Sequence, residues 1–334
     1  MTTNAPSTYR RLLSVVGSAL IAVVSASFAS AQTAPERVYP KQPVKLLVGF
    51  PPGGSVDIVA RIVSEKLTVR LGQPFVVENR AGAGGMIAAE AAAKAAPDGH
   101  TLLVAPPSTC CVIPVVHTKV PYDPLDSFEY ITVLARFPHL LTVSGESPHR
   151  SVADVLAWAK ANPTKANYAS ASPFFQLLTE LFKSKTGAPF EHIPYKGGSE
   201  MVPAILAGEV TMAFMDAGNV MGHLRSGKMR ALATTGAQRF ADLPDVPTLG
   251  EIGVAGIAVE GWVGIQAPRG MPKSIVDLLA NEIAEILKLT DVRERLAQLG
   301  MSPGSGTPVE MRRDVERQLA LWRNVAASTN IKRD

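Results

Sequence analysis

The sequence contains few of the residues on which several common protein classes depend. Its 334 residues include only two cysteines, which are adjacent at Cys110 and Cys111. An exported protein held together by disulfides carries several spaced cysteine pairs, so this fold does not depend on disulfides. The two thiols could form a strained disulfide with each other or remain as two reduced, half-buried side chains at a strand end. We favour the reduced pair.

Charged residues are also scarce, at 19% against 46% hydrophobic residues, a balance typical of a well-buried globular protein. The formal charge is only +4, and no cluster of lysine and arginine with interleaved aromatic residues appears. A nucleic-acid partner is therefore not expected. The mild positive charge is compatible with a small anionic ligand but does not argue for one.

The motifs of the main enzyme classes are missing as well. The six histidines form no H-x-x-x-H or H-E-x-x-H pair, so no metal site is expected. The chain has no G-x-S-x-G elbow and no G-x-x-x-x-G-K-[ST] loop. Gly82-Ala83-Gly84 begins like G-x-G-x-x-G, but Ile87 occupies the final small position. A glycine-rich turn is the better interpretation, and neither a cofactor nor a catalytic residue is predicted.

The first 31 residues have the features of a targeting signal. Arg10 and Arg11 precede an uncharged apolar run at 12–28, and the small-x-small pattern ASA follows at 29–31. We therefore predict a cleavable signal peptide at 1–31 and a mature protein in the periplasm. A retained membrane anchor is the alternative, but the run is short and ends at a cleavage pattern. The general export route is favoured, because YRRLLS matches a twin-arginine signal poorly. No later stretch is long and apolar enough to span a bilayer.

The rest of the chain alternates strands and helices. Apolar runs at 44–50, 75–79 and 101–105 each end in a loop rich in glycine or proline, and helical patterns follow the first two. This rhythm predicts a parallel sheet covered by helices.

A second α/β unit begins near residue 137. Its expected elements are a strand, break and strand over 130–145, helices at 152–161 and 173–186, and strands at 190–195 and 210–216. A last strand at 262–268 and two helices at 273–288 and 308–326 have no sheet of their own and must dock elsewhere.

The loop FPPGGSVD after the first strand is a candidate ligand site, because open parallel sheets bind ligands at the carboxyl ends of their strands. Gly53 and Gly54 permit close backbone approach, and Ser55 can cap the following helix. The free N–H groups at a helix start suit a carboxylate or a phosphate. A tight turn with a capped helix is the plain alternative. The candidates here are Phe50, Pro52, Gly53, Gly54 and Ser55.

A second loop, at 169–172, also leads directly into a helix. Ser172 is the expected N-cap, Pro173 the first helical residue and Gly187 the terminator. Two helix starts from two units, directed at one cleft, could hold both ends of a diacid. Asp216 ends a strand and either faces this cleft or serves as a solvated or capping residue. The remaining candidates are Ser108, Thr109, Ser170, Ala171, Ser172, Phe175 and Asp216.

Many segments of the chain together resemble one family. The sequence is similar to the Bug-type extracytoplasmic solute receptors, the substrate-binding proteins of tripartite tricarboxylate transporters, over residues 36–330. The resemblance is carried by segments in the expected order: FPPGGSVD, GQPFVVENRAGAGG, AAPDGHTLLV, PYDPLDSF, IPYKGG, LAGEV, RALATTG, LPDVPTLGEIG and WVGIQAPRGMPKSIVDLL.

The resemblance implies a two-lobed α/β periplasmic binding protein of the type II, clamshell kind, with a parallel-based sheet in each lobe. Lobe 1 would comprise 36–136 plus 262–334, and lobe 2 would comprise 137–261. The chain after about residue 262 would thus return to the first lobe, which would explain the strand and helices that lack a sheet of their own.

The resemblance also implies the function. An organic acid would be held in the interlobe cleft, partly through backbone amides and ordered water, and passed to an ion-driven integral-membrane permease. The receptor is expected to be a monomer without catalytic activity. Two other classes compete: a secreted enzyme, such as a hydrolase or a periplasmic dehydrogenase, for which no convincing reactive group is found, and a receptor that signals to a sensor kinase.

The chain departs from the family pattern in two loops. The loop ASASPFF carries Phe174 and Phe175 where many members have polar residues, and PPSTCCVIP carries Ile113 and the two cysteines where many have an asparagine. Phe174 shares a helical stripe with Leu178 and Leu181, which predicts core packing. Sulfur and phenyl groups would suit an aromatic or otherwise apolar acid. An aliphatic dicarboxylate is the main competitor.

Overall fold

The computed structural model describes residues 39–195, 198–329 and 331. The predicted signal peptide at 1–31 lies outside these residues. Residues 42–334 form one compact unit, and the remaining unit, 1–41, is described only from residue 39. Within the described part of the chain, no helix has the length and apolar character needed to cross a membrane.

The first part of the sheet is parallel, as the sequence predicts. Strand β1 (Val44–Val48) lies between β2 (Phe75–Asn79) and β3 (Thr101–Ala105) and pairs with both in parallel. Helix α2 (Ser55–Leu71) and helix α3 (Met86–Ala93) provide the crossovers. Four of the five β1 residues are buried, as expected of a strand covered on both faces.

The glycine-rich turn predicted after β2 is confirmed. The short 3₁₀ helix η1 (Ala83–Gly85) has positive φ angles throughout and is preceded by Gly82 with φ 139°. A Cβ added at Gly49 would lie 2.4 Å from the Cα of Gly85. The small residues therefore let the loops after β1 and β2 pack directly against each other.

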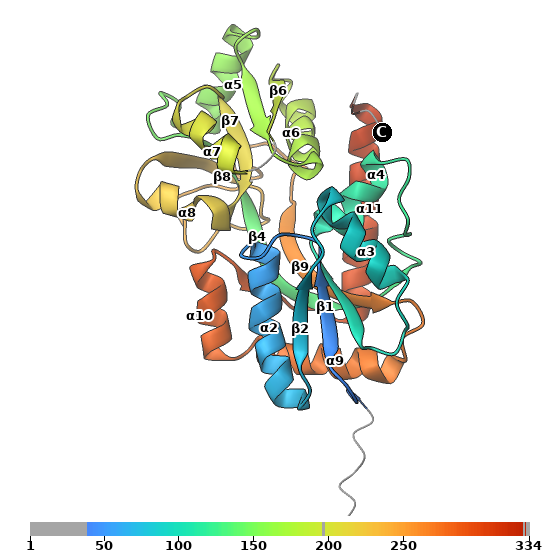
Figure 1. Cartoon of the computed structure of the whole chain (residues 1–334). Coiled ribbons are helices and arrows are strands. Elements are labelled where there is room, and N and C mark those ends of the chain that lie inside the picture. Colours follow the sequence, from blue (N-terminus) through green and yellow to red (C-terminus); the bar gives the residue numbers. More distant parts are fainter. Residues whose placement is uncertain (1–38, 196–197, 330, 332–334) are drawn as a thin grey trace, which may run out of the picture. The chain divides into compact units, whose positions relative to one another are not determined.

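The segment predicted as strand, break and strand is a single strand, β4 (Phe128–Ser144). Residues 128–138 of β4 pair with the antiparallel strand β9 (Glu260–Pro268). Beyond Pro138, β4 changes partners and pairs with β7 (Met212–Asp216) and β8 (Met229–Thr234). The break predicted within 130–145 was wrong, because Pro138 stands where the partner strand changes and no continuous ladder needs its missing N–H. In Figure 1, β4 runs from the strands beside α2 toward those beside α8.

The second group of strands surrounds the far half of β4. Strand β5 (Asn167–Ser170) pairs in parallel with β6 (Glu191–Pro194) and β7. The helices of this part are α5 (Val152–Ala161), α6 (Pro173–Thr186), α7 (Gly198–Leu206) and α8 (Ala217–Arg225). The strand order is β2-β1-β3-β9-β4-β7-β5-β6, with β8 and β10 (Ser302–Pro303) also paired to β4.

The C-terminal part contains three helices where two were expected. They are α9 (Lys273–Ile286), α10 (Thr290–Gln298) and α11 (Pro308–Ser328). Helix α10 was missed because its sequence, TDVRERLAQ, is largely polar and buries only Val292 and Leu296. Strand β9, which had no evident sheet in the sequence, lies between β3 and β4 and is antiparallel to both. The lobe boundaries near 137 and 262 stay a prediction.

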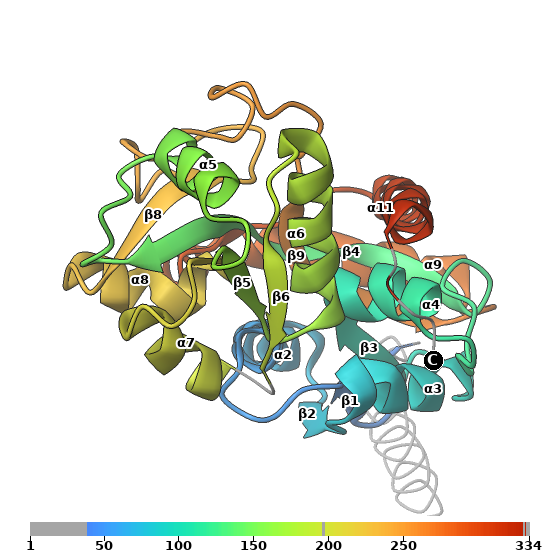
Figure 2. The same cartoon turned by 90° about the horizontal axis from the view of Figure 1, so that it is seen from above.

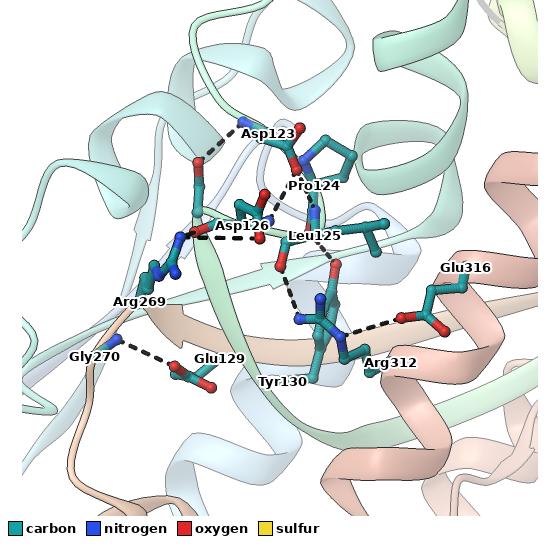
Figure 3. Close-up of polar contacts among 11 residues, drawn as sticks. Asp123, Pro124, Leu125, Asp126, Glu129, Tyr130, Arg269, Gly270, Arg312 and Glu316 are labelled. Atoms are coloured by element: carbon teal, nitrogen blue, oxygen red, sulfur yellow. Dashed lines mark hydrogen bonds and ion pairs between the residues drawn. The ribbon is translucent and has the colours of Figure 1, made fainter.

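Polar contacts attach the C-terminal segments to the start of β4 (Figure 3). The guanidinium of Arg312, on α11, donates to the carbonyl of Leu125 at 2.8 Å and pairs with Glu316 at 3.2 Å. The N–H of Gly270, just after β9, donates to Glu129 at 3.2 Å. Helix α11 packs against β4 and is seen end-on beside it in Figure 2. The returning chain is thus fixed to the start of β4 and the loop before it by specific hydrogen bonds.

The turn after β3 is helical, not the open loop that the sequence suggested. A π-helical turn (Ser108–Val112) runs into α4 (Ile113–Val116) and contains both cysteines. Cys110 and Cys111 are free and fully buried, so the expectation of half-buried residues at a strand end was wrong. Burial raises the pKa of the Cys110 thiol to about 12, although a hydrogen bond from Gln266 lowers it slightly. Both thiols are therefore inert packing groups.

Candidate ligand-binding site

A cavity of about 530 Å³ lies at the ends of β1, β3, β5 and β7 and receives residues from both groups of strands. Its volume is in the range of small-molecule sites. The lining residues are Phe50, Pro51, Gly54, Ser55, Val56, Pro106, Pro107, Ser108, Phe137, His139, Ser172, Phe174, Phe175, Asp216, Asn219 and Gly261.

A second cavity, of about 600 Å³, lies around Arg136, Gln238, Glu260 and Arg293. None of the residues that follow β1, β3 or β5 lines it. Because ligands of open α/β sheets bind where the parallel strands end, the first cavity is the candidate site.

One wall of the candidate cavity is the N-terminus of α2. Gly54 is the N-cap residue and supplies no side-chain cap, so the prediction that Ser55 caps the helix was wrong. The first helical hydrogen bond runs from the N–H of Ile58 to the carbonyl of Gly54 at 2.9 Å. The amides of Ser55, Val56 and Asp57 find no acceptor among the described residues. These N–H groups, at the positive end of a 17-residue helix, form a site suited to an anion.

The carboxylate of Asp57 holds the preceding loop in place. It accepts hydrogen bonds from the N–H of Gly53 at 2.9 Å, from Arg61 at 2.9 Å and from Asn79 at 2.8 Å. Burial tends to raise the pKa of Asp57, but these three hydrogen bonds and the charge of Arg61 outweigh it and lower the pKa below its usual value. Because the N–H of Gly53 is already bound to Asp57, it does not belong to the free donor set.

The opposite wall begins at the N-terminus of α6, which forms as predicted. The hydroxyl of Ser172 accepts from the N–H of Phe175 at 3.4 Å, Pro173 is the first helical residue and Gly187 ends the helix in the left-handed conformation. Pro173 has no N–H, and that of Phe175 is taken by the cap. Among the described contacts, the amide of Phe174 is therefore the one donor left at this helix start.

Aromatic side chains cover this wall. The rings of Phe174 and Phe175 lie 4.8 Å and 5.4 Å from the imidazole of His139, and Phe137 lies 5.7 Å from it. Phe174 is buried and also packs on Trp322, which confirms its predicted core role, but it lines the cavity too. Phe175 is half-buried and lines the cavity with its neighbour.

His139 and Asp216 are the two ionisable residues among the described lining of the cavity. The Nδ1 atom of His139 lies 2.8 Å from Oδ1 of Asp216. The His139 side chain is 3% exposed and that of Asp216 is 24% exposed. Asp216 occupies the N-cap position of α8 but makes no side-chain cap, so of its two expected roles the structure shows the one that faces the cavity.

The predicted site residues divide into two groups. Lining the cavity are Phe50, Gly54, Ser55, Ser108, Ser172, Phe175 and Asp216. Outside the lining are Pro52, Gly53, Thr109, Ser170 and Ala171.

Two residues outside the lining have their hydroxyls bound elsewhere. Thr109 is buried and donates to the carbonyl of Gly84 at 2.9 Å. Ser170 is buried and lies 2.7 Å from Nε2 of His192. Cys110 and Cys111 do not line the cavity either, so the idea that sulfur shapes the ligand site was wrong.

Sequence reasoning missed several lining residues: Pro51, Val56, Pro106, Pro107, Phe137, His139, Asn219 and Gly261. The prolines stand in loops that had been singled out and could have been included. His139 is a lone histidine within an apolar strand, and its pairing with Asp216 depends on the register of β4 with β7. No local sequence pattern predicts the contact between His139 and Asp216.

The architecture defines a class of protein before any relative is considered. The first group of α/β elements continues through β9 into the first half of β4, the second group pairs with the far half of β4, and the cavity is lined by loops from both groups. This is the arrangement of a two-lobed periplasmic solute-binding protein of the clamshell type.

The chain belongs to the tripartite tricarboxylate transporter receptor family, whose model matches residues 59–331. It is 35% identical to Protein BugT of Bordetella pertussis over 325 residues, which cover 96% of this chain and 98% of that protein. The predicted resemblance to Bug-type receptors is thereby confirmed. The family and fold also confirm a non-enzymatic solute receptor.

Two solved structures carry bound acids. An R. palustris protein with adipate is 35% identical, has a TM-score of 0.78 and corresponds to 86% of this chain and 97% of its own. MatC from Rhodopseudomonas palustris, with bound malate, is 31% identical, has a TM-score of 0.75 and corresponds to 86% and 99% of the two chains.

Proposed function

We propose that this periplasmic receptor captures an organic carboxylate in the cavity between α2 and α6 and delivers it to a membrane permease of the tripartite tricarboxylate type. The observation that carries the proposal is the N-terminus of α2. There the amides of Ser55 and Val56 are unpaired within the described structure, and both residues line the cavity.

A carboxylate suits these donors for two reasons. Its two oxygens can accept from adjacent backbone N–H groups, and hydrogen bonds to an ionised acceptor are stronger than neutral ones. The helix adds a favourable dipole at the same place. No lysine or arginine is among the described residues that line the cavity, so backbone amides and neutral side chains would provide most of the recognition.

The body of the ligand would lie against rings. Phe50, Phe137, Phe174 and Phe175 all line the cavity, which favours an aromatic or otherwise apolar acid. The structures of relatives with adipate and with malate support the competing class, an aliphatic dicarboxylate. Adipate is compatible with both walls of the cavity. One of its carboxylates could bind the amides of α2, and its methylene chain could pack against the aromatic rings.

Thermal shift measurements on refolded, ligand-stripped mature protein test the binding claim. The panel would hold benzoate, phthalate, adipate, malate and citrate, with amino acids and sugars as comparison compounds. A ligand that binds only the folded state raises the melting temperature, and a concentration of 100 times Kd adds roughly 2.7 kcal/mol of stability. Stabilisation by one class of acid is expected. Stabilisation by sugars alone, or by none of the compounds, would contradict the proposal.

Delivery to a permease needs a separate test. Uptake of the labelled acid should fall in cells that lack the receptor gene and return when the wild-type gene is restored. Export by the predicted signal peptide at 1–31 would be checked in the same strain by the mass of the periplasmic protein. Unchanged uptake together with lost transcriptional response to the acid would instead support the alternative of a signalling receptor.

A further inference from the structure

The candidate cavity contains a charge arrangement that the binding of an anion does not explain by itself. Among its described lining residues, His139 and Asp216 are the two that can ionise. A carboxylate ligand would thus enter a cavity that already holds the carboxylate of Asp216, and the described part of the lining offers no lysine or arginine to offset it. Two negative charges in a partly desolvated cavity repel each other much more strongly than they do in water.

His139 is placed to remove this repulsion. An ionised carboxylate only accepts hydrogen bonds, so the 2.8 Å contact with Asp216 requires the proton of the imidazole to sit on Nδ1. In the neutral ring, Nε2 then carries a lone pair. The structure gives this buried Nε2 no hydrogen-bond partner. A buried polar atom without a partner is costly in a folded protein and indicates an unmet interaction.

Among the described residues, the ring contacts of His139 and the cavity lining include no other ionisable group. From β4 and α6 the imidazole contacts the rings of Phe137, Phe174 and Phe175. From α8, the lining residue nearest in sequence to Asp216 is the neutral Asn219.

The charged neighbours along the strands face elsewhere. Arg136, three residues before His139 on β4, lines the second cavity and pairs with Asp314 at 3.0 Å. Glu260, which precedes the lining residue Gly261 on β9, also lines the second cavity. Among the described lining residues, the pair of His139 and Asp216 is therefore the place that can take up a proton to balance charge in the cavity.

We infer that binding of a carboxylate ligand is coupled to the uptake of one proton by the pair of His139 and Asp216. The inference rests on the proposed function, because it concerns the same cavity and the same class of ligand. The proton comes from solvent and converts the imidazole into an imidazolium. Nδ1–H then remains bonded to the carboxylate of Asp216, and Nε2–H becomes a second donor in place of a lone pair.

The sign of the pH dependence follows from this uptake. The complex holds one more proton than the free receptor, so raising the pH opposes binding. Uptake of one full proton corresponds to a fall in affinity of about tenfold for each pH unit, and partial uptake to a smaller fall. A ligand that carries its own ammonium group would neutralise Asp216 directly and would bind without proton uptake. The coupling thus selects a class of ligand: simple carboxylic acids in preference to amino acids at mildly acidic pH.

Titration calorimetry with adipate and with benzoate tests the coupling. Each acid is titrated into wild-type receptor between about pH 6.5 and about pH 8.5, in two buffers of different ionisation enthalpy. Carboxyl groups of this kind titrate near about pH 4 to 5, so the ligand itself exchanges almost no protons in this window. We expect net uptake of up to one proton per ligand, together with an affinity that falls as the pH rises, by at most about tenfold per pH unit.

Variants assign the proton to the pair. His139→Gln replaces the imidazole with a side-chain amide that can donate a hydrogen bond but cannot titrate, so it should abolish both the proton uptake and the pH slope. His192→Gln is the matched control, because His192 is a partly buried histidine that lies outside the lining and contacts Ser170. This control should retain the wild-type slope. Asp216→Asn removes the charge that requires neutralisation and should also abolish the slope.

The outcomes separate this inference from the proposed function. Tight binding of either acid with no proton uptake and a flat pH profile would overturn the coupling and leave the carboxylate receptor intact. Undiminished uptake in folded His139→Gln would also overturn it. No binding of any acid of the thermal shift panel at any pH would overturn the proposed function, and the coupling with it.

Discussion

The helix starts of α2 and α6 both line the cavity, yet they offer different chemistry. Helix α2 begins at Gly54 without a side-chain cap and leaves three amides without an acceptor in the described structure. Helix α6 begins with a Ser172 cap and Pro173, which together leave a single amide. Aromatic rings follow at once on α6 but not on α2.

The difference lies in which residue stabilises each turn. At α2, the carboxylate of Asp57 reaches back to the N–H of Gly53, so the loop is fixed while the first helical amides stay open. At α6, the hydroxyl of Ser172 uses up one of the helical amides. A short polar residue before a helix therefore does not by itself indicate an anion site. The number of amides that remain unpaired decides how well the helix start can hold a carboxylate.

The largest expected effect comes from closing the α2 wall. Gly54 has φ −75° and ψ 163°, which any residue can adopt, and an added Cβ would meet only the carbonyl of Pro51, at 3.5 Å. The Gly54→Val variant should therefore fold normally, and its side chain should block access of a ligand to the backbone amides of Ser55 and Val56. We expect at least a 100-fold loss of affinity, about 2.7 kcal/mol, by titration calorimetry.

Gly222→Val is the control for this change. Gly222 lies exposed in α8, and an added Cβ there would have no neighbour within 4 Å. This variant should bind like wild type. Wild-type affinity in folded Gly54→Val would show that the α2 wall does not hold the ligand.

Asp57→Asn should weaken the hydrogen bonds that hold the loop before α2 in place. The amide cannot accept from Gly53, Arg61 and Asn79 as the carboxylate does, so the free energy of unfolding should fall by about 1–3 kcal/mol at neutral pH. The pKa of Asp57 is lowered in the folded protein, so its contribution is fully present above the unfolded value of about 3.9 and disappears as the pH falls below it.

Urea denaturation at neutral pH and near pH 3 measures this difference. The difference in the free energy of unfolding between Asp57→Asn and wild type should be smaller at the acidic pH than at neutral pH. Asp277→Asn serves as the control, because Asp277 is exposed and its ion pair in the described structure is with Lys273 on the same helix. If Asp277→Asn lowered the free energy of unfolding as much as Asp57→Asn does, Asp57 would have no particular role in stabilising the loop.

Phe175→Ala tests the aromatic wall. If the rings contact the body of the ligand, benzoate should lose roughly 0.5–1.5 kcal/mol more affinity than malate, because ring–ring contacts add about this much beyond area burial. Titration of both acids into the same variant provides the comparison. Equal losses for the two acids would remove the argument for an aromatic ligand.

The smallest effect on binding is expected at the α6 cap. Ser172→Ala should lower the free energy of unfolding by about 1 kcal/mol, as should Ser151→Ala at the cap of α5, which lies outside the cavity lining. Affinity for the panel acids should change by less than about threefold, since a change of 1.4 kcal/mol would be tenfold. A loss of binding in Ser172→Ala alone would transfer the main anion site from α2 to α6.

The sequence predicts elements well where local chemistry sets them. Helix α6 could be placed from its serine cap, its first-turn proline and its final glycine, and β1 from an unbroken apolar run. The single strand β4 could not be predicted, because a proline within an apolar run locally indicates a break. Pro138 is tolerated within the strand because the pairing partner of β4 changes there from β9 to β7. Helix α10 was missed because two buried apolar residues are too few to define a helical repeat in the sequence.

The site shows the same division. Gly54 and Ser172 were identifiable because each precedes a helix at the end of a strand. The pair of His139 and Asp216 was not, because it joins residues 77 apart through strand register. Thr109 and Ser170 are in the right segments, but their hydroxyls are bound to other groups within the fold. Segments can be chosen from a sequence, whereas the direction of a side chain depends on packing.

A crystal structure of the receptor grown with adipate or benzoate is the most direct test of the central claim. We predict a carboxylate of the ligand within about 3 Å of the amides of Ser55 and Val56, with its apolar part against Phe175. A ligand bound instead in the second cavity, around Arg136 and Glu260, or held in the first cavity without contact to α2, would contradict the account.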